Sequence, residues 1–160
     1  MITIIQRVIQ SSVTVNNKVI AEIEHGIMAL VAVEKEDTEQ EATRLLERVL
    51  NYRIFSDEND RMNLSLRDTE GCLLLIPQFT LAADTEKGNR PSFTSAAPPE
   101  LGKQLFQFLS DRAKHSYHAV ACGQFGADMK VALINDGPVT FTLRTRPTNH
   151  HPDRRHTVEI

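Results

Sequence analysis

Cysteine, tryptophan and long apolar stretches are scarce in this chain of 160 residues. It has two cysteines and no tryptophan. Cys72 and Cys122 each lie in or beside an apolar stretch, which is typical of reduced thiols and not of a disulfide framework or a zinc site. The longest apolar runs, such as residues 27–33, are far too short to cross a bilayer. We therefore expect no bound metal, no cofactor and no membrane partner.

A secretory signal is also missing from the start of the sequence. Residues 1–7 lack the basic beginning, the apolar stretch and the small-residue cleavage site of a signal peptide. A cytoplasmic location is the resulting expectation.

Basic residues are fewer than acidic ones, and the formal net charge is −3. A protein that coats DNA or RNA through a broad basic field is therefore excluded, and any RNA contact must be local. Lys87 and Arg90 are one candidate for such a contact. The segment 147–160 is another, because several arginines and histidines gather around it. We expect a single domain over 1–146 followed by a polar, flexible tail over 147–160.

The first third of the chain has the pattern of β-strands. Apolar residues alternate or cluster with β-branched ones over 2–15 and again over 19–23, and Asn16 and Asn17 supply a turn between them. This is the signature of a hairpin. The apolar run 27–33 predicts a strand that is covered on both faces.

Two helices are predicted between and after the strands. Thr38 and Glu41 have the spacing of a capping box, and apolar residues recur at helical intervals after them. A second helix begins at Pro98-Pro99-Glu100 and ends near His115. The order of elements predicts an α+β domain with mostly antiparallel sheets, one core, and helices packed on one side.

Two short polar segments follow predicted strands. Gln78-Phe79-Thr80-Leu81 comes after the run 72–76, and residues 135–140 (Asn-Asp-Gly-Pro-Val-Thr) come after 129–134. Strand exits that present amides, hydroxyls and a Gly-Pro bond indicate a functional site on a rigid scaffold. The X-Pro bond is also where a cis peptide costs least.

These segments resemble the Gln-Phe-Thr and Asn-x-Gly-Pro-Val-Thr signatures of the D-aminoacyl-tRNA deacylases. Further matches in the same order are Gln6-Arg7-Val8, Arg53-Ile54-Phe55, Met62-Asn63-Leu64-Ser65, Arg90-Pro91-Ser92-Phe93 and the segment 123–129. The resemblance implies a barrel-like β-sheet domain with two main helices. It also implies a homodimer in which the partner chain completes each site, and hydrolysis of D-amino acids from tRNA.

Gln78, Phe79 and Thr80 are the expected catalytic residues. Ester cleavage passes through an oxyanion, and backbone N–H groups of this turn can stabilise it. We expect Thr80 to act as an orienting or binding hydroxyl. The alternatives are a plain turn residue and a nucleophile, but a threonine hydroxyl needs an adjacent base. The first acidic residue after the turn is Asp84, and no histidine lies near. This favours a mechanism in which backbone groups and the 2′-hydroxyl of the substrate do the chemistry.

Gly137 and Pro138 are the expected chiral filter. If their carbonyls face the position of an L side chain, an L substrate meets a rigid wall, whereas D-aminoacyl and glycyl esters enter. A plain tight turn is the competing interpretation. The other expected substrate-binding residues are Asn135, Val139, Met129 and Arg7, and ordinary core packing is the alternative for Met129. Lys87 and Arg90 are the expected tRNA-binding residues, with a solvated loop as the alternative.

One position departs from the family pattern, since Pro77 stands where a serine usually precedes Gln-Phe-Thr. Proline removes an N–H and a hydroxyl from the turn. Two other functional classes stay open on the sequence alone. One is a non-catalytic RNA-binding module that uses Arg90 and the tail, and the other is an amidohydrolase that depends on Thr80.

Overall fold

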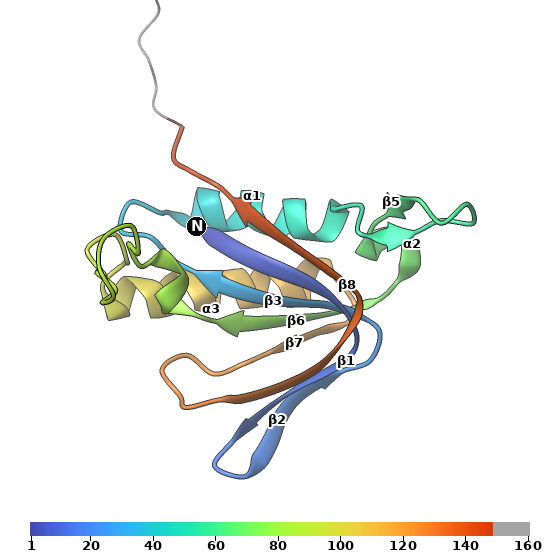
Figure 1. The fold of residues 1–160 in the computed structure, drawn as a ribbon, viewed down its shortest axis with the longest axis horizontal. Coiled ribbons are helices and arrows are strands. Elements are labelled where there is room, and N and C mark those ends of the chain that lie inside the picture. Colours follow the sequence, from blue (N-terminus) through green and yellow to red (C-terminus); the bar gives the residue numbers. More distant parts are fainter. Residues whose placement is uncertain (149–160) are drawn as a thin grey trace, which may run out of the picture.

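A computed structural model describes residues 1–148, and the predicted tail lies outside the described residues from position 149 on. Figure 1 shows a strongly curved, barrel-like sheet with two long helices against it. The elements in chain order are β1 (Ile2–Val15), β2 (Lys18–Ile23), β3 (Gly26–Ala32), α1 (Glu39–Asn51), β4 (Phe55–Ser56), β5 (Met62–Leu64), α2 (Leu66–Thr69), β6 (Cys72–Pro77), the 3₁₀ turn η1 (Phe79–Ala82), α3 (Pro99–Ser116), β7 (Val120–Cys122) and β8 (Lys130–Arg144).

The predicted hairpin is confirmed. β1 and β2 pair antiparallel, with Val15 opposite Lys18. Asn16 and Asn17 have φ values of 50° and 62°. Positive φ at both central residues is what a tight two-residue hairpin turn requires, and asparagine tolerates it better than most residues.

The main sheet is mixed, and most of its strand pairing is antiparallel, as expected. Its order is β2-β1-β3-β6-β7, with β8 paired to β1. β1 pairs antiparallel with β2, β3 and β8, but β3–β6 and β6–β7 are parallel. The connections that contain α1 and α3 explain the parallel half, because a crossover helix returns the chain to the starting edge of the sheet.

Residues 129–143 do not form two strands with an exit between them, as the sequence pattern suggested. β8 is one long strand that is interrupted by a wide bulge. Val8 pairs with Asn135 and Gln6 with Thr140, so residues 136–139 stand opposite Arg7 alone. The sequence signal of a turn was therefore the signal of a bulge, which also needs glycine and an unpaired backbone.

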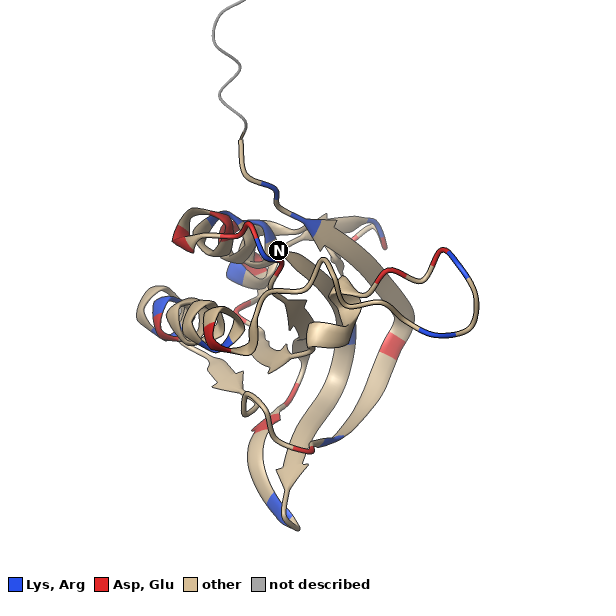
Figure 2. Ribbon diagram, turned by 90° about the vertical axis from the view of Figure 1, so that its left-hand side faces the viewer, with Lys and Arg blue, Asp and Glu red and all other residues tan. Residues whose placement is uncertain are grey.

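Both main helices are confirmed. Thr38 caps α1 and forms the predicted capping box with Glu41, and Pro99 occupies the first turn of α3. The helices lie together on one side of the sheet, as Figure 2 shows. None of the helices among residues 1–148 is long and apolar enough to cross a membrane.

Two clusters of buried side chains replace the single core that was expected. One lies between the helices and the sheet and includes Ile27, Leu73 and Leu75. The other lies on the opposite, concave face and includes Met28 and Leu74. Successive residues of β3 and β6 thus enter different clusters, which explains their unbroken apolar runs.

Candidate active site

The Gln78-Phe79-Thr80 turn begins where β6 ends. The backbone N–H of Gln78 donates to the carbonyl of Val31 at 2.7 Å, which fixes the turn to the neighbouring strand β3. Phe79 and Thr80 then open η1. Within the described residues neither of their backbone N–H groups has a hydrogen-bond acceptor. Two donors at the start of a helical turn are thus available to a ligand.

The side chain of Thr80 contacts an amide and not a base. Gln78 Nε2 donates to Thr80 Oγ1. Among the described residues, no imidazole or carboxylate makes a hydrogen bond to that hydroxyl. A nucleophilic threonine needs a proton acceptor within hydrogen-bonding distance of its hydroxyl. The geometry therefore suits an orienting hydroxyl better than a nucleophile.

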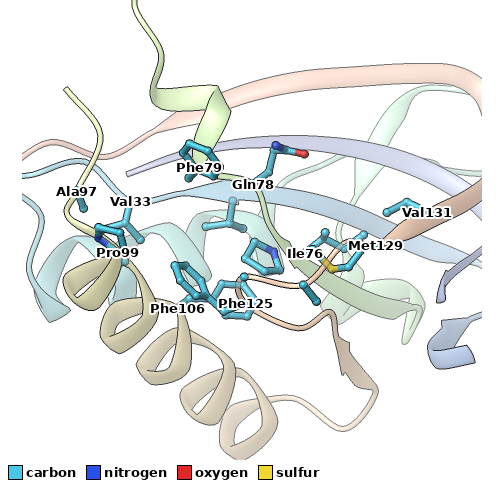
Figure 3. Close-up of a pocket in the computed structure, with 15 residues that line it drawn as sticks. Val33, Ile76, Gln78, Phe79, Ala97, Pro99, Phe106, Phe125, Met129 and Val131 are labelled. Atoms are coloured by element: carbon cyan, nitrogen blue, oxygen red, sulfur yellow. The ribbon is translucent and has the colours of Figure 1, made fainter. Parts of the chain in front are cut away.

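An apolar cavity of about 440 Å³ opens beside this turn. Figure 3 shows it between the end of β6, the first turns of α3 and the loop before β8. Gln78, Phe79 and Met129 contribute to its wall. Other lining residues are Val31, Ile76, Pro77, Phe106 and Phe125. A cavity of this size and polarity, with a few polar groups at one side, is typical of a small-ligand site.

Gly123 packs closely against Met129 and Pro77, two residues that line the cavity. A Cβ on Gly123 would lie 3.0 Å from the sulfur of Met129 and 3.3 Å from Cδ of Pro77. Met129 is partly buried against the concave cluster, so it contributes to packing and also lines the cavity.

The bulge of β8 is held by Arg7. Its Nε donates to the carbonyl of Asp136 at 3.0 Å, and its Nη1 donates to the carbonyl of Ile54 at 2.9 Å. The Gly137–Pro138 peptide is cis, and both residues are exposed. Gly137 has a φ of +132°, and a Cβ there would lie 2.8 Å from Cγ2 of Val139. Only glycine fits this backbone without strain.

The two signature segments do not share a cavity within one chain. Among the described residues that line it, none comes from 135–139 and Arg7 is absent too. The structure thus brings Met129 together with Gln78 and Phe79, whereas Thr80 belongs to the same turn but does not line the cavity. It leaves Asn135, Gly137, Pro138 and Val139 on the bulge, apart from that site.

Lys87 and Arg90 lie on an exposed loop next to the turn. The backbones of Asp84 and Ser92 close the loop through two hydrogen bonds of 2.7 and 3.0 Å. In Figure 2 it projects on the right, with acidic residues near its start and basic residues farther along. Both cations are exposed to solvent.

Sequence reasoning missed the residues that form the floor of the cavity. Phe106 had a detectable signal, because it neighbours the apolar stripe of the second predicted helix. Phe125 lies in the motif 123–129, which was quoted for the resemblance but given no role. No local pattern shows that these rings meet β6, because that contact joins segments far apart in the chain.

In the part of the chain that the structure describes, none of the charged groups with displaced pKa values lines this cavity. Arg144 pairs with Glu34 beside the amino group of Met1. Burial would raise the pKa of Glu34, but hydrogen bonds and attraction from Arg144 and Met1 together lower it. These pairs connect the segment after β3 to the N-terminus and to the end of β8, and they take no part in the site. Residues 1–148 contain no cluster of three metal-ligating side chains.

Comparisons with known proteins now decide the family. The model of the D-Tyr-tRNA(Tyr) deacylase family matches residues 4–144. The chain belongs to this family. The D-aminoacyl-tRNA deacylase of Nitrosococcus oceani is 58% identical over 147 residues, which cover 92% of this chain and 95% of the relative. The D-aminoacyl-tRNA deacylase of Colwellia psychrerythraea is 57% identical over 143 residues, which cover 89% of this chain and 99% of the relative. Membership confirms the resemblance and sets aside a non-catalytic RNA-binding module.

Two solved structures have the same fold. The c-Myc DNA Unwinding Element Binding Protein is 35% identical, with a TM-score of 0.87 over 92% of this chain and 100% of that one. A probable eukaryotic D-amino acid tRNA deacylase has a TM-score of 0.75 at 18% identity, over 90% of this chain and 98% of its own. At that identity, the second likeness concerns the fold alone.

Proposed function

We propose that this protein hydrolyses the ester of D-aminoacyl-tRNA in the cytoplasm, accepts glycyl-tRNA and rejects L-aminoacyl-tRNA. Membership of the deacylase family makes the chain a hydrolase of aminoacyl-tRNA esters. The proposal adds the chirality rule and its cause. A backbone wall at Gly137 and Pro138 bars an L side chain, and glycine passes because it has none.

One observation supports the chemistry. Within the described residues, the backbone N–H groups of Phe79 and Thr80 have no hydrogen-bond acceptor, and their turn lies beside an apolar cavity. An aminoacyl ester is already activated by its ammonium group and by the neighbouring ribose hydroxyl. Modest stabilisation of the oxyanion therefore suffices, and each positioned N–H contributes roughly 10²–10³ in rate. In this mechanism water attacks the ester carbonyl, and the 2′-hydroxyl of the substrate takes a proton from the water and passes one to the leaving 3′ oxygen as the ester C–O bond breaks. Thr80 and Gln78 orient polar groups.

The filter requires a second copy of the chain. Gly137 and Pro138 are exposed on a bulge and do not line the cavity of their own chain, so we place them in the cavity of a partner. Exposed apolar side chains on β1, β2 and β8 support such a homodimer, because a partner chain would remove apolar surface from water. These residues are Ile9, Val19, Ile20 and Ile134.

Hydrolysis of D- and L-tyrosyl-tRNA, measured side by side without added metal, tests the chirality rule. The purified protein should release D-tyrosine and glycine and leave L-tyrosine attached. Equal release of D- and L-tyrosine would refute it.

Mixing two defective variants tests the shared site. Phe79→Pro removes one oxyanion donor at a position where proline is tolerated, the first residue of a helical turn. Gly137→Ala disrupts the bulge. If the partner supplies the filter, co-refolded chains form one site with both segments intact, and D-selective turnover returns. If both segments served the same chain, no mixture would regain it.

A further inference from the structure

Two phenylalanine rings lie in contact on the surface beside the cavity, and the proposed mechanism uses neither ring. Phe79 is 57% exposed and Phe93 is 42% exposed. Their ring centroids are 5.3 Å apart, with the planes tilted by 48°. In Figure 3 the ring of Phe79 lies at the edge of the cavity, above the apolar lining. Adjoining aromatic surface left in water marks an interaction site.

Hydrogen bonds hold the backbone next to both rings. Phe79 follows Gln78, which is bonded to β3 through Val31. Phe93 follows Ser92, which exchanges two backbone hydrogen bonds with Asp84, and its own carbonyl accepts from Ala96 at 3.1 Å. A ligand that stacks on these rings meets a surface that is already ordered, which reduces the entropy cost of binding.

The loop between the rings carries exposed cations. Lys87 and Arg90 follow Asp84 and Glu86 in this loop. The Asp84 carboxylate accepts from the backbone N–H of Glu86 at 3.0 Å, which holds it at the start of the loop. Aromatic rings next to free lysine and arginine are the combination that binds single-stranded nucleic acid.

We infer that the Phe79–Phe93 pair stacks the unpaired nucleotides that precede the terminal adenosine of the aminoacyl-tRNA. The inference rests on the proposed function, which brings the esterified adenosine to the cavity. The preceding nucleotides must then leave along its rim, where the two rings lie. Every base has a π-face, so such a platform holds any tRNA end and leaves the choice of ester to the cavity.

Comparing a full substrate with a minimal one tests the inference. Phe93→Ala should raise KM for D-tyrosyl-tRNA about tenfold, since stacking of one base corresponds to roughly 5- to 150-fold in affinity. The same variant should hydrolyse D-tyrosyl-adenosine, which lacks the preceding nucleotides, as well as the unaltered protein. Phe93→Tyr should restore the low KM. Met62→Ala, which removes a side chain of similar exposure on distant β5, is the matched control.

Fluorescence gives a readout that is independent of catalysis. An uncharged RNA hairpin ending in single-stranded CCA, with 2-aminopurine at the penultimate base, should be quenched by the unaltered protein and not by Phe93→Ala. Equal losses on both ester substrates, or no loss on either, would overturn the inference. So would a fall in sedimentation mass for Phe93→Ala, because a second copy of the chain would then cover the rings.

The two proposals fail separately. An unaltered protein that leaves D-tyrosyl-tRNA intact refutes the proposed function, and the quenching of the uncharged hairpin still decides whether the rings stack RNA.

Discussion

Arg7 holds Asp136 across the bulge of β8. Its Nε donates to the backbone carbonyl of Asp136 at 3.0 Å and lies 3.4 Å from the carboxylate of the same residue. Arg7 is the only β1 residue opposite four residues of β8, and its side chain donates to the bulge that they form. Arg7 reaches the two carbonyls with two separate nitrogens of a planar group, whereas a lysine would have to reach both with a single nitrogen.

Arg7→Lys should therefore loosen the bulge and weaken chiral selection. The substitution keeps the charge but leaves the carbonyl of Ile54 or that of Asp136 without a donor. A buried acceptor that loses its partner costs about 1–3 kcal/mol, so the free energy of unfolding should fall by that amount. The D-to-L ratio of hydrolysis should fall with it. Arg67→Lys, at an exposed pair with Glu47, is the control and should change neither.

Thr80→Ala should cause only a mild defect. The variant loses one hydrogen bond with Gln78, and such a bond contributes about 0.5–1.5 kcal/mol, or roughly 2- to 12-fold in rate. Single-turnover hydrolysis of D-tyrosyl-tRNA measures it. Complete loss of activity, together with an acyl-enzyme that can be trapped in the unaltered protein, would instead establish a threonine nucleophile.

Pro77→Ser should raise activity. Pro77 lines the cavity directly before the donor turn, and serine restores an N–H and a hydroxyl there. The bond from Gln78 to Val31 does not involve the proline nitrogen, so the turn should keep its shape. We expect kcat/KM for D-tyrosyl-tRNA to increase several-fold, with a small loss of thermal stability from the removed ring contact. Unchanged kcat/KM would mean that neither added group reaches the ester.

The sequence predicted the local elements well because their signals are local. The Asn16-Asn17 turn, the Thr38 cap and the start of α3 each depend on a few neighbouring residues. The parallel pairing of β3 with β6 and the bulge opposite Arg7 depend on contacts between distant segments. Periodicity carries no information on such contacts. For the same reason the motifs identified the donor turn, whereas the cavity floor formed by Phe106 and Phe125 was found only in the structure.

The capping box of α1 contains a buried carboxylate. Glu41 is 1% exposed, and its Oε2 accepts from the backbone N–H of Thr38 at 2.8 Å and from its hydroxyl at 2.6 Å. Burial alone would raise the pKa of Glu41, but the hydrogen bonds from Thr38, with attraction from Arg44, outweigh it and lower the pKa. A lowered pKa in the folded state means that the carboxylate stabilises the fold when it is charged.

Stability should consequently fall with acidification in a defined range. The contribution of Glu41 is fully present above the ordinary glutamate pKa of about 4.3 and is lost as the pH falls through the lower pKa of the folded state. Glu41→Gln should lower the free energy of unfolding at pH 7 by about 1 kcal/mol, the usual cost of a lost cap. The difference in the free energy of unfolding between the variant and the unaltered protein should then become smaller toward pH 3.5. Urea unfolding at both pH values measures this difference, and exposed Glu39→Gln is the control. A difference that stays constant with pH would show that packing of the side chain, and not its charge, stabilises the start of α1.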